Sequence, residues 1–282
     1  MDRRLKIFFC LTFAISWGVP LLFLVLAPSI GHSRINLMMY SMLYYVGVWG
    51  PAVAAFITIA WVDGEDGLIN FWRRIIAWRT PRRWYVAALV GIPLIYIMAA
   101  SIAWMLGGEA FSWPSSFGAW GMVILMALGR LIAGPMEEIG WRGYALPLLQ
   151  QQFSGLGAAV VLGFIWGVWH LPLFLNGMGH SLVAFIAQIV AVSIIFTVLF
   201  NASRGCIPLM ILCHWLTNFP YPWEGDADLM PAQSFMLVLA AALACIVFGK
   251  RYLGRENLYN RTPGSGDDPD LDLVGVERQV VS

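Results

Sequence analysis

Charged side chains are scarce in this chain. Of its 282 residues, 12% are Asp, Glu, Lys or Arg, whereas 60% are hydrophobic. Soluble domains carry about 25% charged residues, so the composition excludes an ordinary soluble domain and favours a membrane protein. The net charge is +1, and we therefore expect no nucleic-acid partner.

Cysteine is also rare and forms no motif. The chain has four cysteines, with no CxxC pair and no spacing typical of metal ligands. This pattern gives no support for a thiolate metal site or a redox pair. We expect small apolar side chains packed in the core, at Cys10, Cys206, Cys213 and Cys245.

Long apolar runs dominate what remains. A transmembrane helix needs about 20 predominantly apolar residues. The sequence therefore predicts an all-α, polytopic membrane protein with about eight transmembrane helices around a polar intramembrane cavity. The expected spans lie near residues 6–28, 38–62, 84–106, 117–136, 155–174, 181–201, 205–221 and 231–249.

The basic residues predict the orientation of these spans. Cytoplasmic links carry an excess of Lys and Arg, and with eight spans the basic links fall on one side. Both termini are then cytoplasmic. Residues Asn70–Trp78 are typical of an interfacial amphipathic helix. The basic link between the second and third spans holds Arg73, Arg74, Arg79, Arg82 and Arg83, whereas another link holds Glu224, Asp226 and Asp228.

A run of charge interrupts the fourth apolar stretch, at EEIGWR. Ionisable groups at membrane depth cost roughly 2.5–3.5 kcal/mol each, so they usually serve a function. Glu138 and Arg142 have the spacing of a helical ion pair. Glu137 points about 100° away on the helix and is left for chemistry. Gly134-Pro135, just upstream, should weaken or kink the helix.

Two later motifs place histidine in similar apolar surroundings. They are WGVWHLP, with Trp166 and His170 on one helix face, and HWLTN, with His214 and Asn218 on one face. Counted along straight helices, Glu138 and His170 lie about 23 Å and His214 about 15 Å from the cytoplasmic links. All three motifs can therefore line one cavity that opens toward the cytoplasm.

These residues leave two chemistries open. In the first, Glu137 is a general base that activates water, with assistance from a histidine, and His214 and Asn218 donate to an oxyanion. In the second, Glu137, His170 and His214 hold a catalytic Zn²⁺ with an open water position. The cofactor is accordingly either none or zinc.

Together, EExxxR (Glu137, Glu138, Arg142), Trp166-xxx-His170 and HxxxN (His214, Asn218) resemble the CPBP intramembrane protease family. This family includes the type II CAAX prenyl endopeptidases and the bacterial Abi-type proteins. The resemblance covers roughly residues 5–250. Trp166 stands where eukaryotic members usually have Phe, which affects the shape of the pocket rather than the chemistry.

The resemblance implies a role for each motif residue. Glu137 would activate the hydrolytic water with His170, and His214 and Asn218 would stabilise the oxyanion. Supporting positions are Glu138, Arg142 and Trp166. The resemblance also implies a CAAX prenyl protease 2-like integral membrane domain over residues 1–250, in a bacterial cell membrane. For the polar cytoplasmic tail over residues 251–282, the acidic composition from Gly264 onward predicts disorder.

We therefore expect an intramembrane endopeptidase that cleaves a membrane-associated or lipidated protein. The alternative is a non-catalytic scaffold or bacteriocin-immunity-type protein that retains the protease fold. Motifs of other intramembrane proteases do not fit, because the chain has no HExxH, no GxGD paired with YD, and no GxSG. Arg130 could snorkel, pair with an acid or bind a lipid headgroup, and the sequence does not decide between these.

Overall fold

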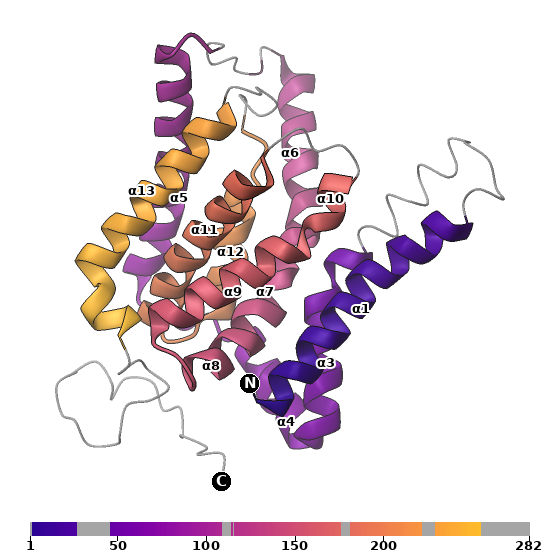
Figure 1. The fold of residues 1–282 in the computed structure, drawn as a ribbon. Coiled ribbons are helices and arrows are strands. Elements are labelled where there is room, and N and C mark those ends of the chain that lie inside the picture. Colours follow the sequence, from indigo (N-terminus) through magenta and orange to yellow (C-terminus); the bar gives the residue numbers. More distant parts are fainter. Residues whose placement is uncertain are drawn as a thin grey trace.

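The fold was obtained as a computed structural model, which describes residues 2–26, 46–108, 114, 116–175, 181–221 and 229–254 (Figure 1). Within these ranges all regular structure is helical. The longer helices are α1 (Arg3–Leu26), α3 (Gly50–Val62), α4 (Gly64–Ile75), α5 (Arg82–Met105), α6 (Phe117–Ile132), α9 (Gly155–Trp169), α11 (Leu182–Ala202), α12 (Ile207–Thr217) and α13 (Leu229–Phe248).

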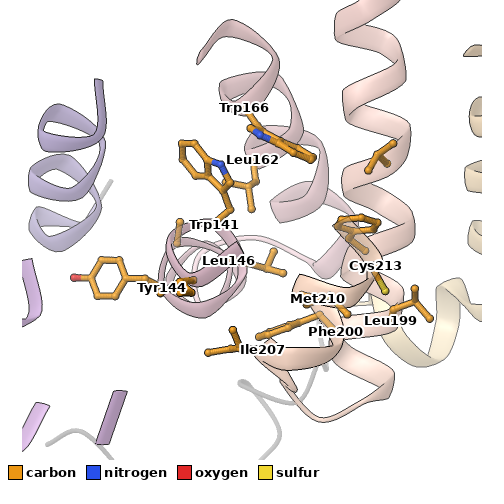
Figure 2. Packing of buried hydrophobic residues seen from close by; sticks show 14 of the residues in the cluster. Trp141, Tyr144, Leu146, Leu162, Trp166, Leu199, Phe200, Ile207, Met210 and Cys213 are labelled. Carbon is orange, nitrogen blue, oxygen red and sulfur yellow. The ribbon is translucent and has the colours of Figure 1, made fainter. Parts of the chain in front are cut away.

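A short composite helix lies at the centre of the bundle. It consists of α7 (Glu137–Gly140), the π-helical turn η3 (Trp141–Ala145) and α8 (Leu146–Gln150), and every one of its residues is buried. Helices α3 and α12 pack on α7, and α9 packs on α8. Figure 2 shows side chains of this composite helix meeting apolar side chains from α9, α11 and α12. The charged motif is therefore carried by the most enclosed helix of the described chain.

Small residues allow the helices to approach closely, as is usual in membranes. A Cβ added at Gly140 would collide with the backbone carbonyl of Pro51 on α3, so these two helices cross almost backbone to backbone. At the contact between α9 and α11, a Cβ at Gly163 would lie 2.8 Å from Ser193 Cβ. The first crossing holds the composite helix closely against α3, and the second holds α9 closely against α11.

Breaks in the helices occur next to the motif residues. Helix α6 ends at Ile132, and the 3₁₀ turn η2 (Gly134–Met136) separates it from α7. This confirms the break predicted at Gly134-Pro135, and its cause is the missing proline N–H. Helix α9 similarly ends at Trp169, and α10 (Leu171–Leu175) begins after His170.

The predicted count of about eight spans is not confirmed. Four helical segments of the described chain are long and apolar enough to cross a membrane, and three shorter helices are also apolar. The breaks described above shorten several elements, and residues 27–45, which include parts of the first two expected spans, lie outside the described ranges. The four long segments are Arg82–Met105, Phe117–Gln150, Leu182–Ala202 and Pro231–Leu253.

The bounds expected for the interfacial helix were wrong. Helix α4 spans Gly64–Ile75, so it starts six residues before Asn70 and ends before Trp78. Glu65 and Asp66 lie in its first turn, where acidic side chains complement the helix dipole. Phe71 is buried, whereas Trp72 is 55% exposed.

The cysteines and the C-terminal tail agree only in part with the sequence-based expectations. Cys206 and Cys213 are buried and Cys245 is half-buried, but Cys10 is exposed, so the prediction of a core position was wrong there. Of the expected tail, residues 251–254 are described and belong to the end of the turn η4 (Gly249–Leu253) and the residue after it. Residues 255–282 and the acidic link 222–228 lie outside the described ranges.

Candidate active site

Glu138 is the centre of a buried charged group. Its Oε1 accepts from Arg142 Nη1 at 2.8 Å, as predicted, and also lies 2.8 Å from His214 Nδ1. The guanidinium of Arg142 lies over the rings of Trp166 and Phe196, at 4.5 and 5.0 Å from their centroids. Arg142 Nε and Nη2 have no hydrogen-bond acceptor among the described residues, and the ring faces stabilise the cation in their place.

Glu137 lies beside this group in a different environment. Its side chain is buried, and its Oε2 accepts from Trp166 Nε1 at 2.8 Å and from Trp141 Nε1 at 3.3 Å. Within the described chain it makes no salt bridge at the distances seen for Glu138. Two neutral indole donors therefore orient Oε2, and neither of these two hydrogen bonds involves the other carboxylate oxygen, Oε1.

The second oxygen of Glu137 lies near the backbone of Gly134, together with two other polar groups. A Cβ placed on Gly134 would lie 2.6 Å from Asn218 Nδ2, 2.9 Å from His214 Nε2 and 3.6 Å from Glu137 Oε1. Three polar side-chain atoms from α7 and the end of α12 thus surround one point, and the absence of a side chain at residue 134 keeps that point accessible to them.

His170 joins this arrangement through Trp166. Its Nδ1 lies 2.8 Å from the Trp166 carbonyl oxygen. Because a carbonyl can only accept, Nδ1 carries the hydrogen, and Nε2 of the neutral ring is the basic nitrogen. The imidazole is half-buried and is held by edge contacts with Trp169 and Phe185, at 4.8 and 5.3 Å between centroids.

The three residues considered as zinc ligands do not form a metal-binding group here. Among the described residues, no set of three His, Cys, Asp or Glu side chains is placed to hold a metal ion. Glu137 Oε2 accepts from two indoles and His214 Nδ1 contacts Glu138, whereas Glu137 Oε1 and His214 Nε2 both lie near Gly134.

Arg130 also has a definite position. It lies in the last turn of α6, and its Nη1 donates to the backbone carbonyl of Asn218 at 2.9 Å. The sequence alone does not decide whether Arg130 snorkels, pairs with an acid or binds a lipid headgroup. The structure connects it to Asn218, a residue of the candidate site.

The straight-helix depth estimate was partly wrong. It placed His214 about 8 Å shallower than Glu138, yet their side chains are in hydrogen-bond contact. The break at Gly134-Pro135 and the proline near the start of α12 invalidate a count along straight helices. No local motif points to Phe196 either, because it lies among the mostly apolar residues of α11.

Comparisons with known proteins find similarity over the segment that carries this site. The family model described as type II CAAX prenyl endopeptidase Rce1-like matches residues 118–220, a segment that contains every site residue predicted from the sequence. CAAX prenyl protease 2 of Methanococcus maripaludis is 26% identical over 268 residues, covering 87% of this chain and 94% of that protein.

The four long apolar helices, together with this family match, indicate an integral membrane protein. The motifs that suggested the resemblance lie in one buried group of side chains, and the matched segment includes all of them. Over residues 118–220 the chain is therefore similar to the Rce1-like family of type II CAAX prenyl endopeptidases, and over most of its length it is similar to a CAAX prenyl protease 2.

Proposed function

We propose that this chain is an intramembrane endopeptidase that hydrolyses a peptide bond of a membrane-associated or lipidated protein, with a water molecule activated by Glu137. The observation that carries the proposal is the convergence of Glu137 Oε1, His214 Nε2 and Asn218 Nδ2 around Gly134. A base and two polar groups at one point are what water-dependent acyl transfer requires.

In the first step, Glu137 takes a proton from water, and the water oxygen attacks the carbonyl carbon of the substrate. The negative charge that develops on the carbonyl oxygen is stabilised by a hydrogen bond from Asn218 Nδ2. His214 donates a second one only when both ring nitrogens carry hydrogen, because Nδ1 already serves Glu138. In its neutral form, Nε2 accepts a hydrogen bond from the water instead.

In the second step, the tetrahedral intermediate collapses and the bond between carbon and nitrogen breaks. The proton held by Glu137 is transferred to the departing nitrogen, so that an amine and a carboxylic acid are formed. His170 assists this transfer, since its Nε2 can hold a proton while Nδ1 stays bonded to the Trp166 carbonyl. Trp166 supports both residues, through its indole N–H and its carbonyl.

The name of one relative supports a substrate class. The relative from Methanococcus maripaludis is named CAAX prenyl protease 2. A lipid attached near the cleaved bond would reach the buried site from the bilayer, which suits a substrate with a prenylated C-terminal Cys-a-a-X sequence. The proposed location is a bacterial cell membrane. Both termini are then in the cytoplasm, because the basic links predict this orientation.

A cleavage assay tests this proposal. The probe is a farnesylated peptide ending in Cys-a-a-X, with a fluorophore and a quencher on either side of the expected bond, and the same peptide without the lipid serves as its comparison. Purified wild-type protein should cleave the lipidated probe, and Glu137→Gln should lose cleavage by about 10²-fold or more, as expected when a general base is removed. Equal rates for Glu137→Gln and wild type would refute the role of Glu137.

Three further measurements complete the assay. Glu65→Gln, at an exposed position in α4, is the matched control for loss of one carboxylate. Zinc analysis of the same preparations tests the metal alternative, since retained zinc that is lost in His214→Ala would assign a ligand role. A wild type that binds the probe without cleaving it would support the non-catalytic scaffold.

A further inference from the structure

Two hydrogen bonds of opposite direction connect α6 with the end of α12. Arg130 Nη1 on α6 donates to the backbone carbonyl of Asn218 at 2.9 Å, and Trp215 Nε1 on α12 donates to the carbonyl of Ala127 at 2.7 Å. On each helix the two participating residues are three positions apart and therefore share a face. We call this pair of bonds the α6–α12 clamp.

Both halves of the clamp lie next to the candidate site. On α6, Arg130 precedes by four residues Gly134, the residue around which the polar atoms converge. On α12, Asn218 is the C-cap, and its backbone N–H bonds to the carbonyls of His214 and Trp215. The clamp thus acts on the turn from which both His214 and Asn218 extend.

The carbonyl that Arg130 contacts is one that a helix cannot satisfy by itself. The last carbonyls of an α-helix have no intrahelical donor, and at membrane depth water is not freely available to replace one. A guanidinium donor forms a stronger hydrogen bond than a neutral group does. The contact therefore restrains the backbone at Asn218, and with it the direction of the Asn218 amide.

The clamp is also a principal attachment of an otherwise peripheral helix. Among the residues of α6, all of which the structure describes, only Ala127 is buried. Trp49 makes a comparable bond to α6, from its Nε1 to the Ile132 carbonyl at 3.0 Å. Trp49 is the N-cap residue of α3, so this bond does not involve α12. Trp49 therefore provides a matched control for a tryptophan bond to α6.

We propose that Arg130 is a positioning residue of the hydrolytic site, which holds the C-terminal turn of α12 so that the Asn218 amide stays directed at the point beside Gly134. The inference rests on the proposed function, because it assigns to Asn218 the task of stabilising the oxyanion.

The kinetic test uses the lipidated peptide probe. Arg130→Gln should lower kcat by about 10- to 100-fold, the size expected when a reacting group is slightly misplaced, with little change in KM. Arg130→Lys should restore part of the loss, because its ammonium can still donate to the carbonyl. Trp215→Phe should lower kcat in the same way, whereas Trp49→Phe should leave kcat unchanged.

A double-mutant cycle separates positioning from a general structural effect. If Arg130 acts through Asn218, Arg130→Gln should have almost no further effect in an Asn218→Ala background. An equal fold-loss in both backgrounds would overturn the proposal, as would an equal loss in Trp49→Phe.

A structural measurement decides the question even if no cleavage is found. In a cryo-EM structure of Arg130→Gln, the Asn218 amide should be displaced from Gly134, with α11 and α13 unchanged. An Asn218 amide in the wild-type position would overturn the positioning role. A wild type without cleavage, combined with a displaced amide, would instead refute the proposed function and leave the clamp supported.

Discussion

His214 Nδ1 lies 2.8 Å from Glu138 Oε1, the same oxygen that accepts the hydrogen bond of Arg142. Glu138 therefore connects the charged motif on the central helix with the histidine motif on α12. This contact fixes which ring nitrogen of His214 is left for the site, since only Nε2 can turn toward Gly134. A carboxylate that holds a histidine in this way sets both its orientation and its tautomer.

The first prediction concerns this connection. Glu138→Gln should lower the free energy of unfolding by about 3–5 kcal/mol, because it leaves Arg142 as a buried cation without its counter-charge. Thermal melting in detergent measures the effect. Glu65→Gln removes an exposed carboxylate and should change stability by no more than about 1 kcal/mol. A melting temperature for Glu138→Gln equal to that of Glu65→Gln would contradict the prediction.

The second prediction concerns the space beside Gly134. Gly134→Ala places a methyl group 2.6 Å from Asn218 Nδ2 and 2.9 Å from His214 Nε2, so it should abolish cleavage of the lipidated peptide while the protein still folds. Gly129→Ala is the control, since a Cβ there has no neighbour within 4 Å, and it should retain wild-type cleavage. Normal activity in Gly134→Ala would show that the reaction does not use this point.

The third prediction concerns the crossing of α3 and α7. Gly140→Ala would force its methyl group into the carbonyl of Pro51, and overpacking of this kind typically costs about 1–3 kcal/mol. Gly121→Ala, on the exposed part of α6 with no neighbour within 4 Å, should be neutral or stabilising because alanine favours helix over glycine. Thermal melting of both variants compares them directly, and a Gly140→Ala protein as stable as Gly121→Ala would contradict the close crossing.

The fourth prediction concerns orientation in the membrane. Helix α5 has the basic link at its start and Leu106, which is 82% exposed, just after its end. If the basic links are cytoplasmic, an impermeant maleimide added to intact cells should label Leu106→Cys and leave Arg79→Cys unlabelled, in a background without the native cysteines. Permeabilised cells should allow labelling at both positions. The reverse pattern in intact cells would invert the predicted topology.

The polar residues of the candidate site can be located from the sequence, because charge in an apolar chain is conspicuous. Glu137, Glu138, Arg142, His170 and His214 were found from the sequence for this reason. The ion pair of Glu138 with Arg142 was also predictable, since it depends on the local helical repeat alone.

Other parts of the site carry no local signal. Phe196 covers the Arg142 guanidinium from within an apolar run, and Pro51 meets Gly140 from a distant helix. Each of the two bonds of the α6–α12 clamp joins residues 88 positions apart. No periodicity relates such residues, because their contact depends on how whole helices cross.

The sequence by itself therefore determined the helical class, the membrane character and the residues able to do chemistry, because these follow from composition and from spacing within one helix. The tertiary structure decided how the two carboxylates divide their partners, with Glu137 held by indoles and Glu138 by Arg142 and His214. It also decided that His214, Asn218 and Glu137 meet beside Gly134. Helix breaks and close crossings set those distances, and they arise only when the whole bundle packs.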